Sequence, residues 1–577
     1  MLLIVCAWIA WFLVSLSIGS ASLKLISLVA GGRTTSSYNL FYRFWFGFAV
    51  LVALLQIISL FLPIGNSALG IICVVALAGI ILNAKNVFTG VSLFFKSSLR
   101  LTNILAFLGV LIVLILVSYS ANKNVTHTDT FIYHYNAVKW VKEYSVVPGL
   151  ANLHGRLGFN SSFFLFAALT ETGIYTGHSA QVALSFLMVM ALLHWLSIIS
   201  NRRSYMPSRI FCMMTIVFIA IHIGLKMDIA SLATDYPMAI VILVFCLALI
   251  DKIENKALLL LSLSALAFTF KLSGMPAIAI ALIAVAGRLW YLRYREGATN
   301  VWKQQWRLSV ASFAVLCIVA GGFITRNIIV SGWLIYPFPV GNLHLPWSSP
   351  GPYVLDLIAW IKSYPKIPGG ASPQTIEGNT FYYWFTQWFY QFMQTFEYVM
   401  LFASSVFLVW AGLQTPRLSQ FIYSRRALIL LLLFALLSIV FWFTSAPDVR
   451  FGSVYFYILL GASVAILYES SSEKKFLKLA IYAGFTFMVV HHTPAYAADR
   501  HPMWFTLAQT VQPKLVRVIA SPPGENPPLY IYMPAEGNQC GDSPLPCTPY
   551  AGGKLHVHQL IRQRVPGDIS KGFLPPK

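Results

Sequence analysis

The chain contains a long series of apolar runs, each about as long as a bilayer-spanning helix. Roughly 20 apolar residues are needed for one span, and about fourteen stretches meet that length. Hydrophobic residues make up 58% of the 577 positions and charged residues 10%, so the apolar surface exceeds what one water-soluble core buries. We therefore predict an all-α polytopic membrane protein with about 13–14 transmembrane helices. The runs lie near residues 3–19, 44–63, 67–83, 101–119, 162–199, 209–227, 236–251, 257–272, 275–292, 308–329, 396–413, 427–445, 451–468 and 476–492.

Residues 162–199 allow two interpretations. They form either two spans or one span preceded by a shallow or re-entrant helix, and we favour the second.

The basic residues indicate which side of the membrane each connector faces. The formal charge is +21, but Lys and Arg lie mainly in short connectors, a pattern that sets topology and argues against a nucleic-acid partner. When the spans alternate, the basic clusters fall on one side, which the positive-inside rule makes cytoplasmic. The loops 120–161 and 331–395 and the tail then face outward. The clusters are Lys85, Lys96 and Arg100; Arg202, Arg203 and Arg209; Arg288, Arg293, Arg295, Lys303 and Arg307; Arg417, Arg425 and Arg426; and Lys474, Lys475 and Lys478.

Three parts of the chain are predicted. Residues 1–100 supply extra N-terminal helices, 101–494 form the core with both outward loops, and 495–577 form a small outward cap. Cys540 and Cys547 flank a Pro-rich loop in this cap, which predicts a disulfide in an oxidising compartment. The compact loops favour a bacterial plasma (inner) membrane, with the outward side facing the periplasm or cell exterior.

The first outward loop concentrates ionisable side chains between two apolar runs. Charge beside hydrocarbon is costly, so such a concentration at a membrane boundary predicts a functional site. Helical spacing from Asp129 places Tyr133, Asn136, Trp140 and Glu143 on one stripe of a short helix. Two interpretations stay open: an interfacial helix with a solvated stripe, or one wall of a binding site. The loop reads THTDTFIYHYNAVKWVKEYSVVPGLANLHGRLGFNSS and carries Asp129, His134, Glu143, His154 and Arg156.

Charges also recur at the other outward turns. Each one alone fits a side chain that snorkels to water. Their accumulation on one face predicts a shared polar site. They are Lys226, Asp228, Asp235, Lys271, Arg326, Asp448 and Arg450.

These residues resemble the glycosyltransferase-C superfamily, multispanning enzymes that use polyprenyl-phosphate sugars, such as aminoarabinose transferases and protein O-mannosyltransferases. In that superfamily an acidic residue opens the first large outward loop and a surface helix follows, as at Asp129. The pattern D-x-x-x-Y-H with PGLANLHGRLGFNSS looks closest to an uncharacterised bacterial multispanning family. The resemblance covers roughly residues 100–460 and is most specific in the first loop. Asp129 lacks the paired acid common in the superfamily, and three extra spans precede the loop.

The resemblance implies an inverting sugar transfer from a polyprenyl-phosphate donor to a glycan, lipid or protein acceptor in the cell envelope. We expect Asp129 to be the general base and Asp235 a second carboxylate, which orients the sugar or binds Mg²⁺ or Mn²⁺ with Asp129. No other cofactor is expected. Lys271, Arg326 and Arg450 are the candidates for the donor phosphate. Candidates for binding sugar or acceptor are Tyr133, His134, Glu143, His154, Arg156 and Asp448.

Several alternatives stay open. His134 is equally suited to be a packed histidine that bonds a backbone carbonyl. The aromatic residues of loop 331–395 fit sugar stacking and also anchoring among lipid headgroups, with short helices expected around 353–363 and 379–395. A lipid-linked saccharide flippase would place charges near the midplane. An O-antigen ligase or polymerase would use an arginine-rich outward loop, whereas residues 331–395 contain no arginine.

Overall fold

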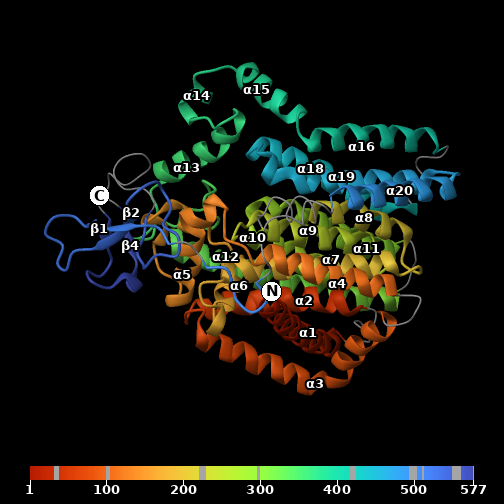
Figure 1. The fold of residues 1–577 in the computed structure, drawn as a ribbon, viewed down its shortest axis with the longest axis horizontal. Helices are drawn as coiled ribbons and strands as arrows, with labels where there is room; N and C mark the ends of the chain where they lie inside the picture. The colour runs from red at the N-terminus through yellow and green to blue at the C-terminus, as the bar shows by residue number, and fades with distance from the viewer. Residues whose placement is uncertain are drawn as a thin grey trace.

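The computed structural model shows long helices side by side, with a small β-containing unit at one end (Figure 1). Apolar runs form helices because only internal hydrogen bonds satisfy the backbone in lipid. The structure describes residues 1–30, 38–98, 104–219, 229–294, 299–415, 421, 424–492, 503–509, 512–548 and 561–575.

Every predicted apolar run overlaps a helix of the bundle. Residues 162–199 form the short α6 followed by the long α7, which matches the favoured interpretation. The bundle helices are α1 (Leu2–Ala30), α2 (Leu40–Ser59), α3 (Asn66–Ser98), α4 (Ile104–Ala121), α6 (Phe163–Thr170), α7 (Ser179–Ser200), α8 (Met206–Val217), α9 (Asp235–Ile250), α10 (Ala257–Phe270), α11 (Pro276–Tyr294), α12 (Thr299–Ser331), α16 (Phe396–Leu413), α18 (Arg426–Ser445), α19 (Val449–Ser470) and α20 (Lys474–His492).

The outward loops and the tail form shorter elements. The helices expected around 353–363 and 379–395 are α13 and α15. These elements are η2 (Thr130–His134), α5 (Tyr135–Glu143), η3 (Leu150–Asn152), η4 (Gly155–Phe159), η5 (Gly173–Tyr175), η7 (Leu272–Gly274), α13 (Gly351–Ser363), η8 (Tyr364–Lys366), α14 (Pro373–Glu377), α15 (Phe381–Met393), β1 (Leu515–Ile519), β2 (Tyr530–Pro534), β3 (Arg562–Gln563), η10 (Ile569–Lys571) and β4 (Phe573–Leu574).

Helix length and composition identify a multi-pass membrane protein. Within the described part of the chain, nine helices are long and apolar enough to cross a membrane, and four more are apolar but shorter. The nine include α1, α2, α7, α12 and α19. The chain is therefore an all-α polytopic membrane protein, as its sequence predicts.

Close packing of α1 on α2 begins the bundle. A Cβ atom on Gly47 would lie 1.8 Å from the Ser15 carbonyl oxygen, and one on Gly19 would lie 2.2 Å from the Arg43 carbonyl oxygen. Glycine lets the two backbones touch, as is common between membrane helices. Next to this contact, Phe48 packs edge-on against Phe166 of α6. The interior that supports the outward loops is therefore continuous from α1 to α6.

Basic connectors gather at one end of the bundle and interact there. Helices α2 and α18 begin at this end, and helices α11 and α19 finish there. The α7–α8 and α9–α10 connectors lie at the same end. Its contacts are Arg209 over Tyr482, Lys252 over Tyr205, Arg426 over Tyr291, Arg425 with Glu469 and Tyr42 with Asp251. Outside the described part lie Arg100, Arg295, Arg417, Lys226, Asp228 and the side chains of Lys85 and Lys96.

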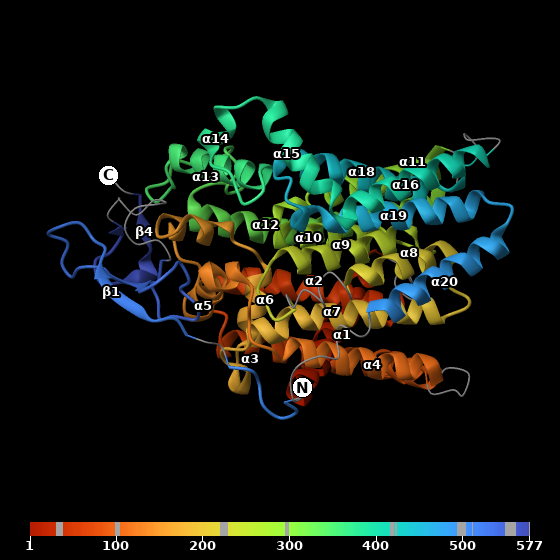
Figure 2. The same ribbon diagram turned by 45° about the horizontal axis from the view of Figure 1, so that its top comes forward.

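The first outward loop lies at the opposite end, together with α13 and the C-terminal strands (Figures 1 and 2). Ala151 packs in a small core with Trp333 and Tyr336 of the second loop. The strands β1 and β2 pair antiparallel, with Leu515 opposite Pro534, and β3 pairs antiparallel with β4. The tail thus folds over the loop that carries Asp129.

Gly149 lies at a close contact between tail and loop. Its φ is +66°, and a Cβ there would lie 2.1 Å from the Phe573 carbonyl oxygen. Only glycine adopts this conformation without strain and leaves room for β4. The Phe573 amide in turn donates to the Pro148 carbonyl at 3.0 Å.

Candidate functional site

Asp129 lies between two arginines from distant segments. Its Oδ1 accepts a hydrogen bond from Arg156 Nη1 at 3.1 Å, and its Oδ2 lies 3.5 Å from Arg450 Nη2. Arg156 belongs to η4 in the same loop, whereas Arg450 lies in the first turn of α19. Both carboxylate oxygens are therefore engaged by guanidinium groups.

A second acid–base pair lies beside the first. Asp235, at the start of α9, forms an ion pair with Lys271, which follows the last residue of α10. The Lys271 ammonium lies 3.8 Å from the ring centre of Phe451, and the Arg450 guanidinium lies 4.8 Å from the same ring. Phe451 thus brings the two pairs together. We call Asp129, Arg156, Asp235, Lys271 and Arg450 the charged cluster.

Electrostatic coupling joins the two halves of the charged cluster. Asp235 and Asp129 both exert a favourable Coulombic field on Arg450. Charges affect one another appreciably only when they are close or poorly screened. The charged cluster is therefore one site rather than two unrelated ion pairs.

The charged cluster is partly open to solvent. The exposed fraction of its side chains rises from 11% for Asp235 to 36% for Arg450. Ion pairs this accessible contribute about 0–1 kcal/mol each to stability. Stability alone gives little reason to place five charges next to hydrocarbon, whereas binding of a charged ligand does.

A widened helical turn follows Asp129 and sets its position. Residues Thr130–His134 form a π-helical turn, which is rare and often occurs at functional sites. The Thr130 hydroxyl lies 3.1 Å from His127 Nδ1 and 3.4 Å from His134 Nδ1, and it accepts a hydrogen bond from the Leu232 amide at 3.1 Å. This network ties the turn to the segment that leads into Asp235.

His134 lies inside this network rather than facing solvent. Its ring packs against Phe164 with 5.3 Å between ring centres. Burial, followed by the field of His127, lowers the pKa of His134 well below its ordinary value. The neutral imidazole is therefore a packed side chain that contacts Thr130, whereas a hydrogen bond to a backbone carbonyl and a contact with sugar both stay predictions.

Tyr133 lies beneath the Arg156 side chain. The guanidinium is 5.4 Å from its ring centre, and the ring also contacts Phe159 and lies 6.5 Å from that of His154. Burial, followed by the field of Asp129, raises the pKa of Tyr133, so the phenol stays neutral. Tyr133 and His154 thus border the charged cluster, and Tyr133 supports Arg156; their binding of sugar or acceptor stays a prediction.

The end of the loop is fastened to α10 beside Lys271. Ser161 Oγ donates to the Phe270 carbonyl at 2.7 Å, and Ser162 Oγ donates to Thr269 Oγ1 at 2.7 Å. These bonds fix the distance between the segment that carries Arg156 and the end of α10. Two adjacent hydroxyl side chains, Ser161 and Ser162, lie at the start of an apolar run, a position that favours hydrogen bonds to a neighbouring helix. We did not predict this contact from the sequence.

Within the described residues, Arg326 forms no ion pair with the charged cluster. It is 5% exposed, and it donates to Asn160 Oδ1 at 3.0 Å and to Ser59 Oγ at 2.6 Å. These bonds connect α12 to the loop and to the end of α2. Arg326 therefore connects these elements, and its predicted role in phosphate binding stays a prediction.

Two other predicted residues have different surroundings. Asp448 caps α19: its carboxylate accepts the Arg450 amide at 2.9 Å, and its carbonyl accepts Trp442 Nε1 at 2.6 Å. Glu143 is exposed at the end of α5, and no ion pair joins it to the charged cluster within the described residues. Of the predicted polar stripe, Asn136 and Trp140 are buried, whereas Glu143 is exposed.

A family model described as a domain of unknown function (DUF8201) matches residues 1–457. The chain belongs to the DUF8201 family. No curated protein and no solved structure matches it. The DUF8201 region contains the whole charged cluster and ends within α19. The strands β1–β4 lie beyond it.

Asp129 and Asp235, the predicted ligands of a divalent cation, are paired with basic side chains in this structure. Mg²⁺ and Mn²⁺ favour sites rich in oxygen ligands, and the described residues contain no group of three His, Cys, Asp or Glu that could hold a metal. Asp129 is engaged by Arg156 and Arg450, and Asp235 by Lys271, so three positive charges oppose a further cation. The use of Mg²⁺ or Mn²⁺ at this site stays a prediction, and the reaction that we propose takes no step through a metal.

Proposed function

We propose that this DUF8201 protein is a glycosyltransferase that moves a sugar from a polyprenyl-phosphate donor to an acceptor outside the cytoplasm. The supporting observation is the convergence of Asp129 and Asp235 with Arg156, Lys271 and Arg450, from four separate parts of the chain. Their position at the outward end, where helices begin and end, suits a donor whose phosphate lies at the membrane surface and whose lipid stays in the bilayer.

The three cations are suited to bind the donor phosphate. Arginine binds phosphate oxygens through its planar fork, and lysine binds them as a point charge. Without a ligand, Asp129 and Asp235 neutralise these cations. An arriving phosphate takes over part of these hydrogen bonds, and an oxygen of Asp129 then becomes available.

The available carboxylate acts as the general base. The acceptor hydroxyl attacks the anomeric carbon, its proton passes to Asp129, and the bond between that carbon and the phosphate oxygen breaks. The bonding electrons leave with polyprenyl phosphate, whose growing charge Arg450 and Lys271 stabilise. Attack opposite to the leaving group inverts the configuration at the anomeric carbon.

The proposed setting is a bacterial plasma membrane with the charged cluster facing the periplasm or cell exterior. Basic connectors at the other end of the bundle support this orientation. The acceptor is a glycan, lipid or protein, and membrane lipids surround the helices.

The proposal is tested with purified protein in nanodiscs and polyprenyl-phosphate sugars. We expect release of free polyprenyl phosphate together with a glycosylated acceptor, both strongly reduced in Asp129→Asn. A flippase would move the intact lipid-linked sugar across the membrane of proteoliposomes without releasing polyprenyl phosphate. That result would replace the enzyme proposal.

A further inference from the structure

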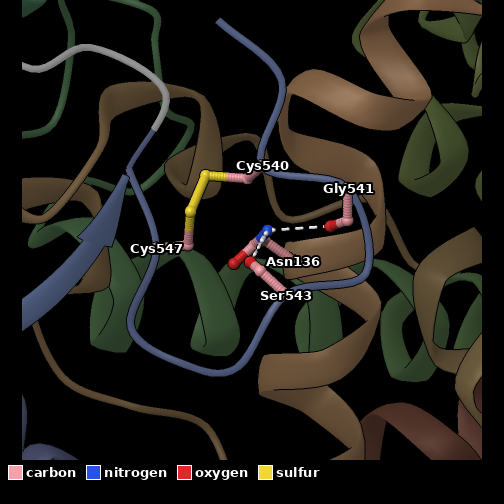
Figure 3. The surroundings of a disulfide bond; sticks show 5 residues. All are labelled: Asn136, Cys540, Gly541, Ser543 and Cys547. Atoms are coloured by element: carbon pink, nitrogen blue, oxygen red, sulfur yellow. Dashed lines mark hydrogen bonds between the residues drawn. A yellow bond between two sulfur atoms is a disulfide. The ribbon is translucent and has the colours of Figure 1, made fainter. Parts of the chain in front are cut away.

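The C-terminal tail contacts the helical segment that starts at Asp129. The Gly541 amide donates to the Phe131 carbonyl at 2.8 Å. Asn136 Nδ2 donates to the Gly541 carbonyl at 3.2 Å and to Ser543 Oγ at 3.5 Å (Figure 3). Residues beyond the DUF8201 region therefore hold a segment inside it.

An ion pair extends this contact by one turn. Lys139 Nζ lies 3.3 Å from Asp542 Oδ1, with both side chains 24% exposed. Phe131 and Asn136 are five positions apart, which is the spacing of a π-helical turn, and Lys139 follows Asn136 by three. The π-helical turn thus aligns all three residues on the side of the segment that faces the tail.

All three tail residues lie inside a loop closed by a disulfide. Cys540 and Cys547 are bonded and enclose Gly541, Asp542 and Ser543. Figure 3 shows the disulfide at the mouth of this loop, above Asn136. A covalent closure removes many of the conformations that an open loop would adopt.

The C-terminal end of the disulfide-closed loop is bonded to strand β2 of the small sheet. The Tyr532 amide of β2 donates to the Pro546 carbonyl at 2.8 Å, and the Thr548 amide donates back to the Tyr532 carbonyl at 3.1 Å. At the other end of α5, Trp140 packs edge-on against Phe573 of β4. The tail therefore contacts the segment that follows Asp129 at two separate points, one through the disulfide-closed loop and one through β4.

We propose that the disulfide-closed loop 540–547 is a positioning element for Asp129, acting through Asn136 and Lys139, so that reducing the disulfide loosens the Asp129 segment. Neither residue touches the charged cluster in the described contacts; each acts through the helical segment. Displacing a reacting group by about 1 Å costs up to roughly a hundredfold in rate. The effect on activity rests on the proposed function, whereas the loosening does not.

The first test measures hydrogen exchange of residues 127–143 in nanodiscs, with and without a dithiol reductant. The reductant supplies two electrons, the sulfur–sulfur bond breaks and two thiols form. We expect roughly tenfold faster exchange after reduction. The variant Cys540→Ser/Cys547→Ser should exchange as fast as the reduced wild type, with or without reductant. Unchanged exchange in protein whose disulfide is fully reduced overturns the proposal.

The second test exchanges the charges of the ion pair. Lys139→Glu faces Asp542 with a like charge, so exchange across residues 127–143 rises; Lys139→Glu/Asp542→Lys restores the pair and lowers exchange again. Glu536→Gln, an exposed acid in the same tail, is the matched control and leaves exchange unchanged. Failure of the double variant to restore protection contradicts the role of Lys139.

The activity measurement separates positioning from mere folding. If reduction acts through Asp129, kcat falls by roughly tenfold to a hundredfold, while the donor KM changes little because Lys271 and Arg450 lie on other segments. An active enzyme whose kcat is insensitive to reduction overturns the positioning role. If wild type shows no transfer, the glycosyltransferase proposal fails and the exchange experiments alone decide the loosening.

Discussion

The carboxylate of Asp129 and the guanidinium of Arg450 lie 3.5 Å apart, although 321 positions separate them in the chain. This contact joins the first outward loop to the start of α19. With Arg156 on the other carboxylate oxygen, it holds Asp129 at the centre of the charged cluster. Any function of this end of the protein therefore depends on the relative position of loop and helix.

Replacing Asp129 with asparagine tests its role as a base. The asparagine side chain would keep the shape and one acceptor oxygen for Arg156, but it cannot take a proton from the acceptor. We expect transfer to fall by about 10²–10⁴-fold, measured as release of polyprenyl phosphate, with the melting temperature almost unchanged. Glu377→Gln, an exposed acid at the end of α14, is the control. Undiminished transfer by Asp129→Asn would show that another group accepts the proton.

Shortening Arg450 tests phosphate binding. A hydrogen bond to a charged group contributes about 1.5–3 kcal/mol, so Arg450→Ala should weaken binding of polyprenyl phosphate roughly tenfold to a hundredfold. Arg450→Lys keeps the charge but loses the planar fork, and an intermediate affinity is expected. Titration in nanodiscs measures both, with Arg564→Ala, which removes a tail arginine stacked on Trp347, as control. Equal affinity in all three variants argues against a phosphate at Arg450.

The sequence predicts the helices, and which loops share one end of the bundle, because both follow from local composition. The run 427–445 became α18 (Arg426–Ser445), and the aromatic stretch 379–395 became α15 (Phe381–Met393). Span length is fixed by bilayer thickness, and alternating spans carry the loops to opposite ends. The stretch LYIYM at 529–533 is also typical of a strand, and β2 begins one residue later, at Tyr530–Pro534.

Side-chain partners depend on how each helix is rotated, which local patterns do not encode. Arg326 and Arg450 both lie at outward helix ends, yet Arg326 turns toward Ser59 and Asn160 while Arg450 turns toward Asp129. The π-helical turn at Thr130 shifts the register of the predicted stripe, so Asn136 faces the tail. Phe451 carries no charge, and nothing in the sequence marks its ring as the contact between Lys271 and Arg450.

Ser59→Ala tests the structural role of Arg326. The substitution leaves Arg326 Nη1 without its 2.6 Å partner inside the bundle. An unsatisfied buried donor costs about 1–3 kcal/mol, so the apparent melting temperature should fall while donor affinity stays the same. Thermal unfolding in detergent measures this, and Ser405→Ala on the exposed face of α16 is the control. Weaker donor binding without loss of stability would return Arg326 to the phosphate site.

The buried His134 makes stability depend on pH in a definite direction. Burial lowers its pKa in the folded protein, whereas the unfolded imidazole titrates near ~6.5. Below that pH the unfolded chain binds more protons, so the free energy of unfolding falls as the pH drops toward the folded pKa, and it is insensitive to His134 above that range.

The lowered pKa of His178 acts in the same direction, and the raised pKa of Glu171 acts in the opposite one. We therefore expect a lower apparent melting temperature at about pH 5.5 than at about pH 7.5, and a smaller difference in His134→Gln, which keeps both other groups. His344→Gln, at an exposed loop position, should retain the wild-type difference. An equal pH effect in His134→Gln and wild type would mean that His134 is not the group that must be neutral for folding.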